Sequence, residues 1–530
     1  MRHGARTWAT LAGLTLLAAA LRLWGLEYGL PQTIARPDEE LIVGKALQIS
    51  VGRIRDPGVF DYSHLTYYVD ALALSGFRGL GRLLGVYAST DDFLVDVAFR
   101  RPGIHYLVCR SVATVFGAAT VLVTAFAAWH GYRRRAVGLA AALLVAVNYL
   151  HARDSHFATV DVPMTFFVTL SLAFALRAAG TQARRDFLLA GLFAGLATSA
   201  KYNAGVVILC AIVAALPRLV SSDEPRARRS AVVSLALAGL LMAAAFAATS
   251  PYCVVHLGDV LTGLVVQRRL LFGGGGGPAW RIHLATTLPG AFGWPGFAAV
   301  VLGVAHAAWR RRPADLVLLA LVVPTFASMA GMTWVFPRYT LPMIPALAIL
   351  AAEAALAVVP PARTAWAVVV SVVLALPALR SIVAYDRLAA REDTRVLAAG
   401  WVAENLPPRS RILVCRGYGA PVINDDHRRP PAFKPHLVPC SIDDVRSTEA
   451  RYLITHEHPY VRFSALRGEV KEWLATDARL LAVFDPFRAG ARVTPFFYRD
   501  DAFYLPWSGF GAVDRGGPIL RIWELPAPRP

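Results

Sequence analysis

Charged residues are scarce in this sequence, and acidic residues are scarcer than basic ones. Only 17% of its 530 residues are Asp, Glu, Lys or Arg, whereas 56% are hydrophobic. The mean hydropathy is positive, at +0.47, and a chain this apolar lies outside the usual range of soluble globular proteins. The composition therefore predicts a membrane protein.

The sequence also lacks the patterns that indicate several other kinds of function. It has no internal repeat, and its glycine run at residues 273–277 lacks the Gly-Lys-Ser/Thr ending of a phosphate-binding loop. No group of side chains has a convincing metal-ligand spacing, since His151 and His156 have no further obvious partners. We therefore predict no metal and no other cofactor, and we interpret the glycine run as an outer loop.

Apolar blocks of membrane-spanning length occupy most of the first 385 residues. A helix needs roughly 20 apolar residues to cross the hydrocarbon core of a bilayer, and about eleven blocks approach this length. They lie near residues 7–26, 104–130, 136–152, 162–179, 187–201, 204–220, 230–250, 284–308, 315–336, 340–359 and 365–384. The first has a longer apolar core than a signal peptide and no clear cleavage site, so we interpret it as a retained span. The expected fold class is a mainly α, polytopic membrane protein.

Arginines in alternate short loops indicate the orientation. A net charge of +18 would favour nucleic-acid binding in a soluble protein, but here the charges follow the bias of cytoplasmic loops toward Lys and Arg. The loops contain Arg2 and Arg6, Arg133 to Arg135, Arg184 and Arg185, Arg226 to Arg229, Arg310 to Arg312, and Arg363. We predict that these loops are cytoplasmic, that the other connections face outward, and that the protein contacts membrane lipids but no nucleic acid.

The first outer loop, at 27–103, is too long for a simple connector. It contains amphipathic stretches at 38–52 and 62–87. Charged residues interrupt the second stretch, so we interpret it as a juxtamembrane helix rather than a span. This loop is assigned to a transmembrane domain at 1–385.

The chain after the last predicted span has a different composition. Residues 386–530 are richer in charge and Pro and contain strand-like runs at 411–414 and 451–454. We predict a small outward-facing α/β domain here. Its Cys415 and Cys440 are compatible with a disulfide in an oxidising compartment, although the odd number of cysteines proves no pairing.

Polar residues beside apolar blocks are costly in a membrane, and here they gather at the predicted outer ends of spans. The motifs are Arg36-Pro37-Asp38-Glu39-Glu40, His151-Ala152-Arg153-Asp154-Ser155-His156 with Asp161, Lys201-Tyr202-Asn203, and Pro337-Arg338-Tyr339. The first three have a structural alternative: Asp38 and Asp161 could only cap helices, and His156 could be an ordinary interfacial residue. Arg338 runs against the inside bias of the other arginines, which favours an anionic partner such as a lipid phosphate. Lys201 could extend toward the headgroups, but the small residues before it favour close helix packing and a charge that faces protein.

Two carboxylates and two cations on one membrane face are sufficient to move a glycosyl group from a lipid phosphate. Cations stabilise the departing phosphate, and a carboxylate removes the proton of the attacking hydroxyl. Phosphate leaves without a second carboxylic acid, in contrast to glycoside hydrolysis. The central hypothesis is that Asp38, Asp161, Lys201 and Arg338 converge in one outer cavity, and single displacement predicts inversion at the sugar carbon.

The motifs resemble those of the polyprenyl-phosphate-sugar-dependent glycosyltransferases of the GT-C fold, which include protein O-mannosyltransferases and lipid A aminoarabinose transferases. The similar stretches, all within about residues 1–385, are Pro37-Asp38-Glu39, Ser155-His156 with Thr159 to Pro163, Gly195-Leu196-Ala197 with Lys201-Tyr202, and Arg338-Tyr339 with Leu341-Pro342. Tyr62-Ser63-His64-Leu65 lies where relatives have Pro-Pro-Leu-Tyr, but the paired prolines are absent. No role is therefore carried over to His64.

The resemblance implies a hexosyl- or pentosyltransferase of the bacterial cytoplasmic (inner) membrane whose active site and C-terminal domain face the periplasm. Its donor would be a sugar on undecaprenyl or a similar phosphate, and its acceptor a protein, lipid or glycan. Asp38 would be the general base, with Glu39 and Asp161 also catalytic, while Lys201 and Arg338 would bind the carrier phosphate. The other expected substrate-binding residues are His156, Tyr202 and Tyr339.

Two functions of other classes compete with this interpretation. A polytopic lipid or glycan transporter would place its sites near the bilayer midplane, often within repeated halves. This sequence instead has its ionisable residues at span ends and shows no repeat. A non-catalytic scaffold that displays the C-terminal domain would leave the motifs of Asp38 and Asp161 without a purpose.

Overall fold

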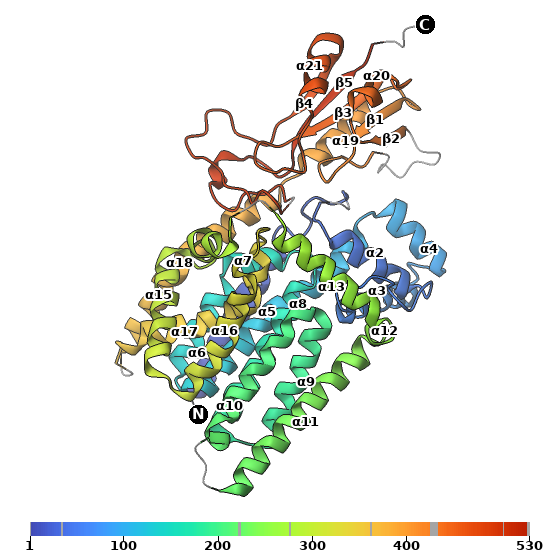
Figure 1. Cartoon of the computed structure of the whole chain (residues 1–530). Coiled ribbons are helices and arrows are strands. Elements are labelled where there is room, and N and C mark those ends of the chain that lie inside the picture. The colour runs from blue at the N-terminus through green and yellow to red at the C-terminus, as the bar shows by residue number, and fades with distance from the viewer. Residues whose placement is uncertain are drawn as a thin grey trace. The chain divides into compact units, whose positions relative to one another are not determined.

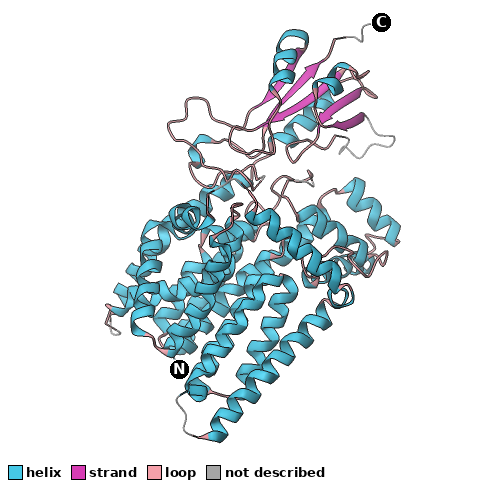
Figure 2. Cartoon of the chain, in the orientation of Figure 1, coloured by secondary structure: helices cyan, strands magenta, loops and turns pink. Residues whose placement is uncertain are grey.

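The computed structural model describes residues 2–32, 35–220, 224–274, 277–360, 363–423, 433–501 and 503–526. Long helices occupy most of the chain, and a sheet with short helices lies near its C-terminus (Figure 1, Figure 2). The predicted outer loop at 273–277 includes residues 275 and 276, which lie outside the described residues.

The chain divides into two compact units, and neither is continuous in sequence. The first unit comprises residues 1–23, 52–71 and 110–383, and the second comprises residues 24–51, 72–109 and 384–530. The second unit thus joins parts of the first predicted outer loop to the C-terminal region. The division predicted between residues 385 and 386 stays a prediction.

Helices occupy all eleven predicted apolar blocks. They are α1 (Arg2–Leu23), α5 (Ile104–Tyr132), α6 (Arg135–Ala146), α8 (Asp161–Thr181), α9 (Arg184–Ala200), α10 (Ile208–Val220), α11 (Pro225–Thr249), α15 (Leu288–Arg310), α16 (Pro313–Ala330), α17 (Ile344–Ala357) and α18 (Thr364–Ala389). Among the described residues, eight helical stretches are long and apolar enough to cross a membrane. The other three blocks form α1, the 12-residue α6 and the 17-residue α9. The fold class is confirmed as a mainly α, polytopic membrane protein with a small C-terminal sheet.

The predicted block at 136–152 is interrupted after α6. The side chain of Asn148 accepts a hydrogen bond from the backbone N–H of His151 and starts a separate short helix, α7 (Tyr149–Asp154). Such N-cap bonds satisfy backbone donors that a helix start leaves unpaired. The polar motif that contains His156 is therefore held at the end of its own helix.

Close packing of α9 against α11 follows from small residues. A side-chain carbon at Gly191 would collide with the carbonyl oxygen of Ala238, and one at Gly195 with that of Met242. Small residues at such positions allow helix backbones to approach closely. The contact fixes the end of α9, where Lys201 follows.

Short helices form both predicted amphipathic stretches of the first outer loop. They are α2 (Glu39–Ser50) and α3 (Leu65–Leu83). Later in the chain, α12 (Pro251–Val255) and α13 (Leu257–Phe272) occupy a connection between two of the predicted apolar blocks. The hydrophobic pattern of the longer blocks gave no indication of these last two helices.

The C-terminal part of the second unit contains a five-stranded sheet in the order β2-β1-β3-β5-β4. The strands are β1 (Arg411–Cys415), β2 (Lys434–Val438), β3 (Tyr452–Glu457), β4 (Arg479–Phe484) and β5 (Ile519–Glu524). Strand β1 pairs in parallel with β2 and β3, while β5 pairs antiparallel with β3 and β4. This topology confirms an α/β region.

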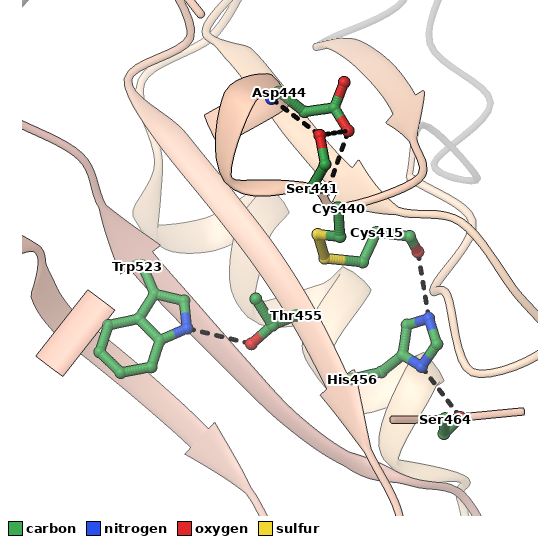
Figure 3. The surroundings of a disulfide bond; sticks show 8 residues. All are labelled: Cys415, Cys440, Ser441, Asp444, Thr455, His456, Ser464 and Trp523. Atoms are coloured by element: carbon green, nitrogen blue, oxygen red, sulfur yellow. Dashed lines mark hydrogen bonds between the residues drawn. A yellow bond between two sulfur atoms is a disulfide. The ribbon is translucent and has the colours of Figure 1, made fainter. Parts of the chain in front are cut away.

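Both faces of the sheet are covered, because successive residues of a strand point to opposite sides. Ile412 and Val414 pack with α19 (Thr394–Asn405), whereas Leu413 packs with α20 (Ile442–Arg446) and α21 (Gly468–Asp477). A disulfide joins Cys415 to Cys440, as the sequence allowed (Figure 3).

Candidate active site

Three charged side chains from separate elements meet in the first unit. Asp161 begins α8, Lys201 follows the last residue of α9, and Arg338 lies in the 3-10 helix η4 (Pro337–Met343). The Nζ atom of Lys201 is 2.7 Å from Oδ1 of Asp161, and Nε of Arg338 is 3.9 Å from Oδ2 of Asp161. Their exposed fractions are 2% for Asp161, 9% for Lys201 and 7% for Arg338. We call these three residues the Asp161 cluster.

The contacts of Asp161 and Lys201 go beyond those of a helix cap and a snorkelling lysine. Asp161 is the first residue of α8, whose N-cap is Val160, and its carboxylate accepts a hydrogen bond from Lys201. Lys201 is buried against protein. Burying an ion pair costs desolvation energy, so such a cluster calls for a reason other than stability.

Aromatic rings surround the cations of the Asp161 cluster. The Nζ atom of Lys201 lies 4.7 Å from the ring centre of Tyr339 and 5.6 Å from that of Tyr62. Ring faces attract cations, most strongly where water is excluded. Lys201 and Arg338 are both suited to donate charge-assisted hydrogen bonds to an anion beside the cluster.

A cavity of about 110 Å³ opens beside Lys201. Three of the predicted residues, Lys201, Tyr202 and Tyr339, line it. Its other lining residues are Asp61, Asn203, Leu264, Gln267, Leu271, Ser328, Met329 and Met332. The cavity therefore provides room for a small polar group next to the buried cations.

Sequence reasoning missed the contributions of Asp61 and of α13 to this cavity. Gln267 in α13 donates a hydrogen bond from Nε2 to the backbone oxygen of Asp61, at 3.0 Å. Asp61 directly precedes the aromatic stretch that begins at Tyr62. The carboxylate of Asp61 beside this stretch could have indicated from the sequence that Asp61 contributes to a site. The approach of α13 could not, because it depends on tertiary packing.

Much of the polar motif around α7 has structural partners. Nδ1 of His151 accepts a hydrogen bond from Arg22, at 2.9 Å, and Arg153 pairs with Asp154 at 2.9 Å. The ring of His156 is held by a bond between Nδ1 and the backbone oxygen of Ala152, at 2.9 Å. These contacts join α7 to α1 and orient His156, whose predicted role in substrate binding stays a prediction.

The acidic motif of α2 belongs to the second unit. Asp38 precedes α2 with a left-handed φ of 72° and makes no capping hydrogen bond. A positive φ in a residue other than glycine is strained and often accompanies function. Glu39 is fully buried, and burial raises the pKa of the neighbouring Glu40 to about 7. Arg36, in contrast, forms a 2.9 Å ion pair with Asp501.

The predicted charged residues thus fall into two groups. Asp161, Lys201 and Arg338 meet within the first unit, and Asp38 and Glu39 lie together in the second unit. The convergence of Asp38 with the Asp161 cluster stays a prediction.

Comparison with known proteins identifies the class of fold. Archaeal oligosaccharyltransferase AglB from Archaeoglobus fulgidus, in complex with an inhibitory peptide and a dolichol-phosphate, matches with a TM-score of 0.53. The identity is 11%, over 98% of this chain and 88% of that chain. The apo form of the same oligosaccharyltransferase matches equally well, with a TM-score of 0.53. ArnT from Cupriavidus metallidurans bound to undecaprenyl phosphate also matches, at 13% identity over 96% of this chain and 98% of that chain, with a TM-score of 0.48.

A protein-family model matches part of the chain. The model described as dolichyl-phosphate-mannose-protein mannosyltransferase matches residues 50–247, which include Asp161 and Lys201. No curated protein matches the chain significantly. Fold and family model together confirm the resemblance to the GT-C glycosyltransferases that the motifs predict.

Proposed function

We propose that this protein is a membrane glycosyltransferase that moves a sugar from a polyprenyl-phosphate carrier to an acceptor hydroxyl, at the outer face of a bacterial cytoplasmic membrane. The observation that carries the proposal is the buried Asp161 cluster beside a cavity in a chain with the GT-C fold. The complex of AglB with a dolichol-phosphate supports a lipid-phosphate carrier. The acceptor would be a protein, lipid or glycan.

Lys201 and Arg338 would bind the phosphate of the carrier. Arg can form two parallel hydrogen bonds to a phosphate, and Lys adds a compact positive charge. Asp161 lies between the two cations and would hold them in position for this task.

Asp38 would be the general base. As the acceptor oxygen attacks the anomeric carbon, its proton passes to Asp38 and a new carbon–oxygen bond forms. The bond between the anomeric carbon and the phosphate oxygen breaks, and that oxygen keeps the electron pair. Attack and departure on opposite faces invert the sugar carbon. Glu39, His156, Tyr202 and Tyr339 would complete the site.

Transfer by purified protein in lipid nanodiscs tests this proposal. The protein is supplied with a panel of labelled polyprenyl-phosphate sugars and candidate acceptors, and labelled product is measured for wild type, Asp38→Asn and Asp91→Asn. Asp91 is an exposed acidic residue of the same unit and serves as the matched control. We expect Asp38→Asn to lower turnover by about 10²–10⁴-fold and Asp91→Asn to leave it unchanged.

Two results would contradict the proposal. Equal turnover in wild type and Asp38→Asn would remove Asp38 as the base. Movement of labelled donor across the bilayer, without cleavage of the sugar–phosphate bond for any donor, would favour a lipid or glycan transporter.

A further inference from the structure

A second cavity opens at the opposite end of α8 from Asp161. Its volume is about 740 Å³, and Thr181, the last residue of α8, is part of its lining. At 1.5 Å per residue, α8 separates the two sites by roughly 30 Å. Thr7 and Trp8, near the start of α1, also line this cavity. It is therefore distinct from the candidate active site.

The second cavity is strongly basic. Arg133, Arg135, Arg177 and His130 line it, and no Asp or Glu is among the described residues of its lining. Arg177 forms an ion pair with the buried Asp186 at 3.3 Å. In the part of the chain that the structure describes, Arg133 and Arg135 have no acidic partner, and both are exposed.

The three consecutive arginines after α5 have different roles. Arg134 donates hydrogen bonds to the backbone oxygens of Leu356 and Val359, at 3.1 and 3.4 Å, near the end of α17. It does not line the cavity, whereas its neighbours Arg133 and Arg135 do. A loop that only signals topology needs no such division, because any exposed arginine serves that purpose.

Two tryptophans give the cavity an amphipathic wall. Trp8 and Trp129 meet edge to face with their ring centres 5.6 Å apart, and Trp8 remains 64% exposed. Tryptophan prefers the headgroup region of a bilayer, where one part of the ring meets lipid and another meets polar groups. The occupant that fits is a molecule with an anionic head and an apolar tail, rather than a soluble phosphate.

We propose that this basic cavity binds the phosphate-bearing headgroup of an anionic phospholipid in the leaflet opposite the candidate active site. Basic pockets between membrane helices are a known mode of recognition for such headgroups. Arg133 and Arg135 bind the phosphate, and Trp8 and Trp129 pack beside the glycerol and upper acyl chain. The site is independent of the chemistry proposed at Asp161.

Native mass spectrometry of the full chain, titrated with phosphatidylglycerol or phosphatidylcholine, tests the site. The variants are Arg133→Gln/Arg135→Gln and the control Arg228→Gln/Arg229→Gln. The control removes the same charge from exposed arginines near the start of α11 that do not line the cavity. We expect the first variant to bind phosphatidylglycerol roughly 30-fold more weakly and the control to bind like wild type.

A second variant keeps the test independent of the arginines. Trp8→Ala, at an exposed position, should weaken phosphatidylglycerol binding severalfold without lowering the melting temperature. The proposal is overturned by equal binding in wild type and Arg133→Gln/Arg135→Gln, or by an equal loss in the control. Saturation of the site by inorganic phosphate alone would also overturn it in favour of a soluble anion.

Discussion

Two clusters of buried charge in the first unit differ in how closely their charges are paired. In the Asp161 cluster, Lys201 contacts the carboxylate at 2.7 Å, and Arg338 lies 3.9 Å from it. In the second, which we call the Arg310 cluster, Arg310 contacts two carboxylates, and Arg312 approaches one of them, Glu353, at 3.8 Å. Arg310 contacts Asp315 at 2.7 and 2.9 Å and Glu353 at 2.9 Å, and Tyr132 donates to Asp315 at 2.5 Å.

The difference teaches that buried charge does not by itself indicate a site. The Arg310 cluster joins α5, α15, α16 and α17, and its arginine is engaged by both carboxylates. It holds helices together. The Asp161 cluster borders a cavity, which gives an incoming anion room beside its cations.

Replacement of Arg310 should have the largest effect on stability. Arg310→Met removes the hydrogen-bonded cation of Asp315 and leaves Glu353 with the longer contact to Arg312, so unfolding should become easier by about 3–5 kcal/mol. Turnover per folded molecule should stay within about twofold of wild type. Chemical unfolding in detergent together with active-site-normalised turnover measures both. Lost turnover at unchanged stability would indicate that the Arg310 cluster has a functional role, and would contradict the distinction between the two clusters.

Replacement of Arg338 should lower turnover more than stability. Arg338→Gln keeps the 2.7 Å ion pair of Lys201 with Asp161, so stability should change less than in Arg310→Met. Loss of one donor to the leaving phosphate should lower turnover by about 10²–10³-fold. Arg268→Gln, at an exposed position of α13, is the control. Destabilisation as large as that of Arg310→Met would show that the two clusters do the same structural work.

Removal of the Tyr132 hydroxyl tests the structural role of the Arg310 cluster. Tyr132→Phe deletes the bond to Asp315 and should cost about 1.5–3 kcal/mol of stability. Double-mutant cycles with Arg310→Met should show coupling, since both residues contact Asp315. Strictly additive free energies of unfolding would argue that Tyr132 is not part of this cluster.

Glu40, which lies outside both clusters, should make stability depend on pH. Its buried Oε2 atom has no hydrogen-bond partner among the described residues, and burial raises its pKa from 4.5 to about 7. The folded state therefore favours the protonated form, so the stability that Glu40 contributes at low pH is lost as the pH rises toward and through 7. The Glu40→Gln variant has no carboxyl group to ionise at this position, so it should not lose this stability as the pH rises. Melting temperatures between pH 4.5 and 8 should show the variant gaining on wild type as pH rises, and a constant difference would contradict this.

The features of the fold that depend on local sequence pattern could be predicted. All eleven apolar blocks are helical, and Asp393, a residue type typical of N-caps, directly precedes α19 and accepts a hydrogen bond from the backbone N–H of Arg395. The small residues of α9 correctly indicated that Lys201 faces protein. Period and composition determine such features because they arise from neighbouring residues.

Other features could not be predicted because they depend on tertiary contacts. Arg310 was interpreted as one of several topology signals, and nothing in its local sequence indicates Glu353 as a partner. The same applies to Asp61 and Gln267, which meet only when α13 folds back toward the loop before α3. The difference between a structural and a functional charge cluster is therefore visible only in three dimensions.

The most direct test of the central claim is the binding of a polyprenyl phosphate without sugar to the full chain in nanodiscs. This measurement isolates recognition of the phosphate from chemistry at Asp38. We predict that affinity falls at least about tenfold in Arg338→Gln and remains at the wild-type value in Arg268→Gln. Equal affinity in wild type and Arg338→Gln would contradict the claim that the Asp161 cluster is the site of the carrier phosphate.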